Sequence, residues 1–293
     1  MKRVLVTGAN GFLGSEITRR LASRGDLEVI PAARTDLQDP ASALTRWRPD
    51  VVAHAAGRTH GSPDAFYADN VALTASLAAG IAAATPRCGM ILLGSAAQYG
   101  ASPDRTPWRE SGPCEPIDDY GTSKLVAEAS AFAEAATSGI LVTSLRIFNV
   151  IAPWAHGEQS FPSFLRKLSV AMAGPPPWRV EMGRLTAMRD FVAVDDVLAA
   201  VERVIDRDIW GQPINVCTGV GRTVSAMLED VANALAGEVV IEQDGPPPML
   251  DWSIGDPALC QARLGFTPSS DLTPLVRSAA AWVKLQAKTG ADA

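Results

Sequence analysis

Short apolar runs, separated by segments with helical periodicity, fill the first half of the chain. The runs lie at residues 4–7, 28–32, 51–56, 89–93 and 140–147, and helices are predicted over 15–22, 41–47, 70–84 and 120–136. Several runs have no polar alternation, so both faces of each strand should be covered, which is typical of a parallel sheet between two layers of helices. The pattern predicts an α/β fold with a doubly wound parallel sheet.

The second half of the chain has a different pattern. Prolines cluster at 175–177 and 246–248, and these clusters predict loops of a smaller lobe. Further strands are expected at 189–194 and 213–217, the first followed by a helix that begins near Asp195. We expect a dinucleotide-binding core of residues 1–150 plus about 186–220, and a substrate-binding lobe of about 151–185 plus 221–293.

Composition narrows the possible function classes. The 293 residues are 47% hydrophobic and 20% charged, which favours a folded core over disorder. A net charge of −6 argues against a nucleic-acid partner. There is no apolar run of the ~18 residues that a membrane span needs, and no signal peptide is predicted. The four cysteines have no metal-ligand spacing, so we expect a reducing cytoplasmic setting and no metal site.

The most informative motif is a glycine turn between the first strand and the first helix. Gly8 permits a tight turn, Gly11 allows close approach of a phosphate to the backbone, and Gly14 allows close packing of the helix. The N-terminus of the following helix offers free N–H groups and the positive end of its dipole. This combination predicts a site for the pyrophosphate of a dinucleotide.

A second motif predicts proton transfer. Tyr120 and Lys124 are four residues apart, so they lie on one face of a predicted helix, where the lysine charge is expected to lower the pKa of the phenol. Ser95 follows a buried strand, at the edge of the sheet where ligands of α/β folds bind. Ser95, Tyr120 and Lys124 are therefore the predicted catalytic residues.

These motifs together resemble the extended short-chain dehydrogenase/reductases, in the branch of nucleotide-sugar epimerases, dehydratases and reductases. The similarity extends over nearly the whole chain, and the motifs that carry it are residues 7–14, 54–57, 69–71, 94–100, 120–124, 145–150 and 189–191. Segments 159–162, 182–191 and 214–219 look most like GDP-4-keto-6-deoxy-mannose reductases. One departure is Ala152, which stands where the family has a glycine before Pro153.

The resemblance implies two sets of binding residues. The cofactor set, which also includes Tyr120 and Lys124, is Gly8, Asn10, Gly11, Phe12, Leu13, Arg34, Asp36, Leu37, Ala55, Ala56, Gly57 and Asn70. The substrate set is Arg58, Ser95, Ala96, Asn149, Gln159 and Arg189, in which Arg189 is expected to hold a diphosphate.

Two positions favour reduction over the related chemistries. Family dehydratases carry an Asp-Glu pair where this chain has Ala96 and Ala97, which have no proton to transfer. In NAD-binding relatives an acidic residue after the second strand binds the ribose hydroxyls, and here Ala33 occupies that position. Arg34 follows, and its guanidinium group is suited to bind the 2′-phosphate of NADP. We therefore expect NADP(H) to be preferred, with NAD(H) also possible.

The sequence thus predicts an NAD(P)H-dependent reductase of a keto group on a nucleotide-activated deoxysugar, working as a homodimer. Three alternatives remain open at this stage. They are a nucleotide-sugar epimerase with resident NAD, a reductase of a small non-sugar ketone, and a binding protein without catalysis. The base, the sugar and the product stereochemistry are not specified by the sequence.

Overall fold

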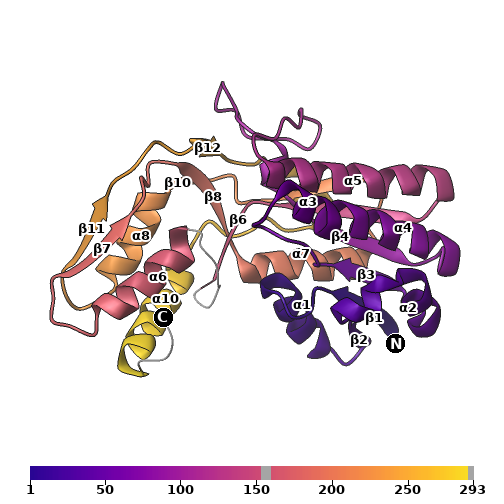
Figure 1. The fold of residues 1–293 in the computed structure, drawn as a ribbon, viewed down its shortest axis with the longest axis horizontal. Coiled ribbons are helices and arrows are strands. Elements are labelled where there is room, and N and C mark those ends of the chain that lie inside the picture. The colour runs from indigo at the N-terminus through magenta and orange to yellow at the C-terminus, as the bar shows by residue number, and fades with distance from the viewer. Residues whose placement is uncertain (153–159, 290–293) are drawn as a thin grey trace.

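The computed structural model describes residues 1–152 and 160–289, and its centre is a six-stranded parallel sheet (Figure 1). The sheet has the order β2-β1-β3-β4-β5-β9. Its strands are β1 (Lys2–Thr7), β2 (Leu27–Pro31), β3 (Val51–His54), β4 (Gly89–Ser95), β5 (Leu141–Ile147) and β9 (Pro213–Val216). The chain goes from β1 outward to β2 and then crosses to β3 on the other side of β1. This reversal is the topological switch point, beside which α/β sheets bind ligands.

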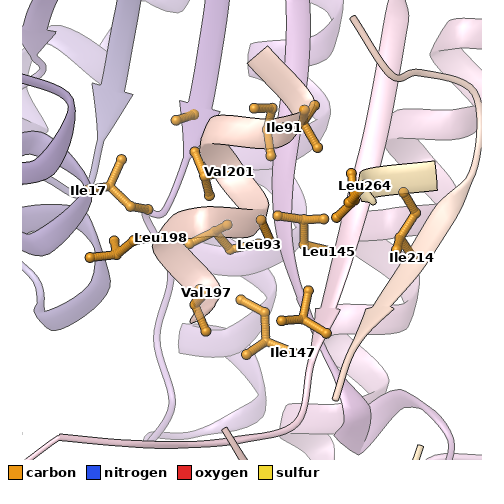
Figure 2. Packing of buried hydrophobic residues seen from close by; sticks show 14 of the residues in the cluster. Ile17, Ile91, Leu93, Leu145, Ile147, Val197, Leu198, Val201, Ile214 and Leu264 are labelled. Atoms are coloured by element: carbon orange, nitrogen blue, oxygen red, sulfur yellow. The ribbon is translucent and has the colours of Figure 1, made fainter. Parts of the chain in front are cut away.

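Helices cover both faces of this sheet. One face packs against α1 (Phe12–Ala22), α7 (Val194–Arg207) and α9 (Ala258–Leu264), and the other packs against α2 (Pro40–Trp47), α4 (Leu73–Ala84) and α5 (Asp119–Ser138). Within β4, Ile91 and Leu93 point into the first layer (Figure 2). Met90 and Leu92 alternate with them and pack into the second layer. Both alternating sets are apolar, which explains the continuous apolar runs in the sequence. The predicted fold class is confirmed.

The predicted strands are all present, with ends that differ by one or two residues, but two helical segments begin at least three residues earlier than predicted. The first begins at Phe12 rather than Ser15, directly after the glycine turn. The helix predicted from Asn70 is preceded by α3 (Pro63–Phe66) and a π-helical turn, η2 (Tyr67–Ala72). Ser62 caps α3 by accepting a hydrogen bond from Ala65 N–H at 3.3 Å. Ser62 followed by Pro63 is a typical sequence for the N-terminus of a helix, and it could have predicted where α3 begins.

The second half of the chain adds a separate hydrophobic cluster, which lies beside the sheet in Figure 1. A small sheet has the order β10-β8-β12, with β6 also paired to β8, and β7 pairs with β11. The strands are β6 (Asn149–Ile151), β7 (Trp178–Met182), β8 (Met188–Ala193), β10 (Gly221–Thr223), β11 (Val239–Gln243) and β12 (Trp252–Ser253). The helices α6 (Ser160–Ala171), α8 (Val224–Asn233) and α10 (Thr273–Thr289) pack against them.

Both proline clusters lie in loops, as predicted. Residues 175–177 connect α6 to β7, and residues 246–248 connect β11 to β12. Among the described residues, no helix is both long enough and apolar enough to cross a membrane.

Candidate active site

The glycine turn packs directly against the segment that follows β3. Gly8 has a φ of +67°, and a side chain there would come within 2.6 Å of the Ala56 nitrogen and 2.7 Å of the Ala55 carbonyl. A Cβ at Gly14 would overlap the carbonyl oxygen of Gly8. Only glycine suits either position. The turn therefore lies in close contact with the start of α1 and with residues 55–56 after β3.

The N-terminus of α1 is open for an anion. Gly11 occupies the N-cap position, none of the described side chains caps it, and the first turn has no acidic residue. Asn10 and Gly11 are exposed, whereas Phe12 and Leu13 are half-buried against the core. The first N–H groups and the helix dipole therefore suit a phosphate, and these residues fit the predicted pyrophosphate site.

A buried histidine connects the glycine turn to the helix beyond β3. The ring of His54 lies 2.7 Å from Thr7 Oγ1 through Nδ1 and 3.0 Å from Thr74 Oγ1 through Nε2. Thr74 donates to the Asn70 carbonyl, so it accepts from Nε2–H, and Nδ1 accepts from Thr7. Burial and the nearby Lys124 lower the pKa of His54 to about 3, so the ring is neutral.

Asn70 organises the site through its side-chain amide. Its oxygen accepts from the Arg58 backbone N–H at 2.7 Å, and its nitrogen donates to the Arg58 carbonyl at 3.0 Å and to Ser123 Oγ at 2.8 Å. Ser123 in turn donates to the carbonyl of Tyr120. Asn70 thus fixes the segment after β3 relative to the start of α5. Both of its amide hydrogens are donated to the protein, and the predicted contact of Asn70 with a cofactor stays a prediction.

Two arginines predicted for different ligands share one carboxylate. Asp69 accepts from Arg34 at 2.9 Å through one oxygen and from the Arg58 guanidinium at 2.8 Å through the other. Arg34 extends from η1 (Arg34–Gln38), which follows β2, and its side chain is 84% exposed. The predicted substrate residue Arg58 therefore lies next to the residue predicted to read the cofactor.

The neighbouring predicted residues Asp36 and Leu37 are engaged with the protein. Asp36 accepts from the Ala33 N–H at 2.9 Å and from Arg46 at 2.7 Å, and the pairing with Arg46 lowers the pKa of Asp36. Leu37 is buried against the core layer that contains Leu44 and Leu77. The contact of these two residues with a cofactor stays a prediction.

The structure brings Ser95 and Tyr120 together. Ser95 ends β4 and accepts from Ala97 N–H at 3.2 Å, which begins the short helix η3 (Ala96–Gln98). Tyr120 lies in the first turn of α5, and an interaction with the Ser95 side chain acts to lower the pKa of its phenol, so the two hydroxyls are neighbours. A Cβ at Gly121 would overlap the Ala97 carbonyl, so this glycine permits the close approach of α5 to the end of β4.

The electrostatics of this pair differ from the sequence expectation. Burial raises the pKa of Tyr120, and the interaction with the Ser95 side chain opposes that rise only in part. The ammonium of Lys124 donates to the Leu93 carbonyl at 2.5 Å, and burial lowers its pKa to about 8. The expected lowering of the phenol pKa is therefore not what the structure shows. A raised pKa keeps Tyr120 protonated at neutral pH, as a proton donor must be.

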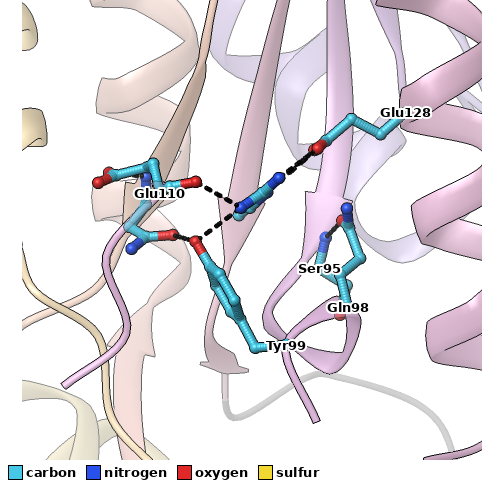
Figure 3. A network of polar contacts seen from close by, with 7 residues as sticks. Ser95, Gln98, Tyr99, Glu110 and Glu128 are labelled. Carbon is cyan, nitrogen blue, oxygen red and sulfur yellow. Dashed lines mark hydrogen bonds and ion pairs between the residues drawn. The ribbon is translucent and has the colours of Figure 1, made fainter. Parts of the chain in front are cut away.

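A buried polar network connects α5, which carries Tyr120 and Lys124, to the strands β5 and β9 (Figure 3). The sequence alone did not predict this network. Arg146 in β5 pairs with Glu128 of α5 at 2.5 Å and donates to the Tyr99 hydroxyl at 2.9 Å. Tyr99 donates to Asn215 in β9 at 2.6 Å. Glu128 lies one helical turn after Lys124, and its charge opposes the lowering of the lysine pKa. The motif at 145–150 contained Arg146, but its partners are distant in sequence.

Two of the predicted substrate residues, Asn149 and Arg189, lie in the small sheet around β8. Asn149 begins β6 and donates to the Asp190 carbonyl at 3.4 Å. The Arg189 guanidinium donates to the carbonyls of Met188 and Leu250 at 2.9 and 2.6 Å, and its burial lowers its pKa. Ala96 is buried in the core, and its contact with a substrate stays a prediction. Gln159 lies outside the described residues.

Asp190 is a buried residue whose role the sequence analysis missed. Its carboxylate accepts from Thr218 N–H and Oγ1 at 2.8 and 2.7 Å and from Gly219 N–H at 2.9 Å. It also accepts from Gly255 N–H at 3.3 Å. These bonds fasten β8 to the loops that follow β9 and β12, and they hold the strand that carries Arg189.

Comparison with known proteins gives a consistent assignment. A model of the NAD dependent epimerase/dehydratase family matches residues 4–217. The chain is 30% identical to a dTDP-6-deoxy-L-talose 4-dehydrogenase (NAD(P)(+)) from Kitasatospora kifunensis, over 94% of this chain and 93% of that one. It is also 30% identical to a GDP-6-deoxy-D-mannose reductase from Pseudomonas aeruginosa, over 83% of each chain.

A solved structure agrees with this assignment. The structure of RMD from Pseudomonas aeruginosa complexed with NADPH superposes with a TM-score of 0.89, at 26% identity, over 98% of this chain and all of that one. The resemblance found in the sequence motifs is thereby confirmed, and the chain belongs to the NAD dependent epimerase/dehydratase family.

Proposed function

We propose that this protein reduces the keto group of a nucleotide-activated deoxysugar with NADPH. The observation that carries the proposal is the pair of neighbouring hydroxyls, Ser95 and Tyr120, at the carboxyl edge of the sheet, where the N-terminus of α1 also lies, uncapped by any described side chain. The named activities of two relatives, a GDP-6-deoxy-D-mannose reductase and a dTDP-6-deoxy-L-talose 4-dehydrogenase, support the choice of substrate class.

Each residue of the site can be given one role in the proposed reaction. NADPH, when bound, supplies the hydride that reaches the carbonyl carbon. Tyr120 donates its proton to the carbonyl oxygen, and Ser95 donates a hydrogen bond to the same oxygen. Lys124, whose pKa of about 8 leaves it mostly charged at pH 7, stabilises the phenolate that remains. The raised pKa of Tyr120 ensures that the phenol carries its proton before the transfer.

The pair formed by Arg34 and Arg58 supports NADPH as the preferred cofactor. Both guanidinium groups are held by Asp69, close to the end of β2, where an acid would otherwise read the ribose. Two arginines at this place suit the 2′-phosphate. We therefore assign Arg58 to the cofactor rather than to the substrate, which revises the prediction from sequence.

Further parts of the proposal concern organisation and location. We propose that the cluster around α6, α8 and α10 forms the substrate-binding lobe, because it carries Asn149 and Arg189 at its junction with the main sheet. Exposed apolar side chains on α5 and η2, Val126 at 42% and Tyr67 at 64%, favour a homodimer. All four cysteines are free thiols, which is compatible with a reducing cytoplasm.

The proposal is tested by following NADPH oxidation with a panel of substrates. The panel contains GDP-, dTDP- and UDP-linked 4-keto-6-deoxysugars, the same sugars without nucleotide, and small ketones. We expect turnover with at least one nucleotide-linked sugar and none with the free sugar. Turnover confined to small ketones would replace the proposal with a non-sugar reductase.

A further inference from the structure

Two arginines stand directly opposite each other on neighbouring strands of the sheet around β8. In the antiparallel pair of β10 and β8, Arg222 is in register with Arg189. Residues in register on antiparallel strands point to the same face, with Cβ atoms about 5 Å apart. Asn149 is in register with Phe191, two residues beyond Arg189, so it points to that face as well. Arg222 therefore shares the face that carries Asn149 and Arg189.

The two guanidinium groups are held by partners on opposite sides of β8. Arg189 donates to the Leu250 carbonyl, just before β12, whereas Arg222 forms an ion pair with Asp230 of α8. β12 and β10 flank β8 on its two sides. Like charges in register are unfavourable, and this divergence separates them. An anion that lies on this face between the two groups would receive donors from both sides.

We infer that Arg222 is a second anion-binding residue of the substrate site and contacts the diphosphate together with Arg189. This inference rests on the proposed function. A diphosphate has two adjacent phosphate groups. One guanidinium group can donate two hydrogen bonds to the oxygens of one phosphate, so two arginines can bind both phosphates. The Arg222 side chain is 31% exposed, so a ligand can reach it while much of its length is shielded from water.

A purely structural role makes different predictions. Arg222 precedes α8, and Thr223 caps this helix by accepting from Ala226 N–H at 3.1 Å. If the ion pair with Asp230 serves only to hold α8, breaking it from either side should lower stability to a similar extent and leave ligand affinity unchanged. If Arg222 binds the diphosphate, only its own substitution should lower the affinity.

The experiment measures binding of nucleoside diphosphates and monophosphates by calorimetry, with the melting temperature of each variant as a folding check. GDP, dTDP and UDP are titrated first, and the tightest binder is carried forward with its monophosphate. Arg222→Ala should lower the affinity for the diphosphate about tenfold. The loss of affinity for the monophosphate should be several times smaller. Arg222→Gln, which keeps a long polar side chain, should show the same loss if the alanine variant folds poorly.

Two control variants separate the possible outcomes. Asp230→Asn breaks the same ion pair but keeps the guanidinium, and Arg179→Ala removes an arginine of β7 that pairs with Glu242 at 2.6 Å. Both should bind the diphosphate like the parent. If Arg222→Ala and Arg222→Gln also bind like the parent, the inference is overturned and the proposed function is unaffected. If the parent binds no nucleoside diphosphate, the proposed function fails, and this inference fails with it.

Discussion

At the scale of single residues, the chemistry depends on a phenol that stays protonated. Burial raises the pKa of Tyr120, while burial lowers that of Lys124 to about 8. At neutral pH the phenol is therefore protonated, and the lysine, below its pKa of about 8, is still mostly charged. The site is therefore prepared for protonation of a substrate oxygen, which is the proton transfer that a ketone reduction requires.

Substitution of Tyr120 by Phe removes the proposed proton donor and little volume. We expect kcat to fall by about 10²- to 10⁴-fold, because that is the usual contribution of one positioned general acid, while NADPH still binds. Steady-state kinetics and cofactor titration measure the two effects. Tyr67→Phe, on a tyrosine that is 64% exposed, is the matched control and should retain parental activity. Near-parental turnover by the Tyr120 variant would refute the assigned role.

The pKa of Lys124 predicts a limb in the pH profile. Below about pH 8 the ammonium is charged and stabilises the phenolate, and above that pH the charge is lost, so kcat/KM for reduction should decline as pH rises through about 8. In Lys124→Arg the guanidinium stays charged in this range. Its residual activity should lack the limb. A limb that persists unchanged in this variant would belong to another group.

The arginines on Asp69 predict the cofactor preference. Arg34→Ala and Arg58→Ala should each lower kcat/KM for NADPH about tenfold and leave the value for NADH within about twofold, because only the 2′-phosphate distinguishes the cofactors. Arg46→Ala serves as the control, since Arg46 pairs with Asp36 at 2.7 Å instead. If the parent prefers NADH, or if Arg58→Ala behaves like the control, the assignment of that arginine to the cofactor is wrong.

At the scale of elements, the site depends on close contacts between one element and the next. The start of α5 approaches the end of β4 because Gly121 lies against the Ala97 carbonyl. The directed hydrogen bonds of His54 and Asn70 connect β1, β3, η2 and α5 in the same way. These contacts determine how far Tyr120 lies from Ser95.

Gly121→Ala should push the start of α5 away from β4. We expect at least a tenfold loss in kcat, because a small misplacement of the proton donor is costly, with a smaller effect on the binding of NADPH. Gly25→Ala, at a position with no atom within 4 Å of the added Cβ, is the control and should be silent. Equal activity of the two variants would show that this contact does not position Tyr120.

Elements were more predictable from sequence than the contacts between them. The period of the apolar runs identifies the strands and the two-layer cover, and the glycine turn identifies the anion site. The partners of Arg58, Arg146 and Asp190 were not predictable, because each comes from another strand or loop that only the folded topology brings near. The pKa of Tyr120 was mispredicted because a four-residue spacing shows the lysine but not the burial.

At the scale of the whole molecule, the buried pair of Arg146 and Glu128 connects the sheet to the catalytic helix. Their side chains are only 7% and 5% exposed. Glu128→Gln would leave Arg146 as a buried charge without its counter-ion, which we expect to cost about 3–5 kcal/mol in the free energy of unfolding. Urea denaturation measures this. The exposed pair of Arg179 and Glu242 is the control, and Glu242→Gln should change stability by less than about 1 kcal/mol.

A loss of less than about 1 kcal/mol on Glu128→Gln would show that the network is not a main support of the fold. The same variant has a second readout, since Glu128 opposes the lowering of the Lys124 pKa. Removal of its charge should lower the pKa of Lys124 further. The decline in the pH profile should then begin at a lower pH.

The central claim is that hydride passes from an added cofactor to the keto carbon of a nucleotide sugar. It is tested most directly with NADPH that carries deuterium at the transferable C4 position and a nucleotide-activated 4-keto-6-deoxysugar, followed by mass spectrometry of the product. A reductase should give one deuterium on the former carbonyl carbon and one oxidised cofactor per product. A product that forms without deuterium and without net oxidation of the cofactor would contradict the central claim and indicate epimerisation instead.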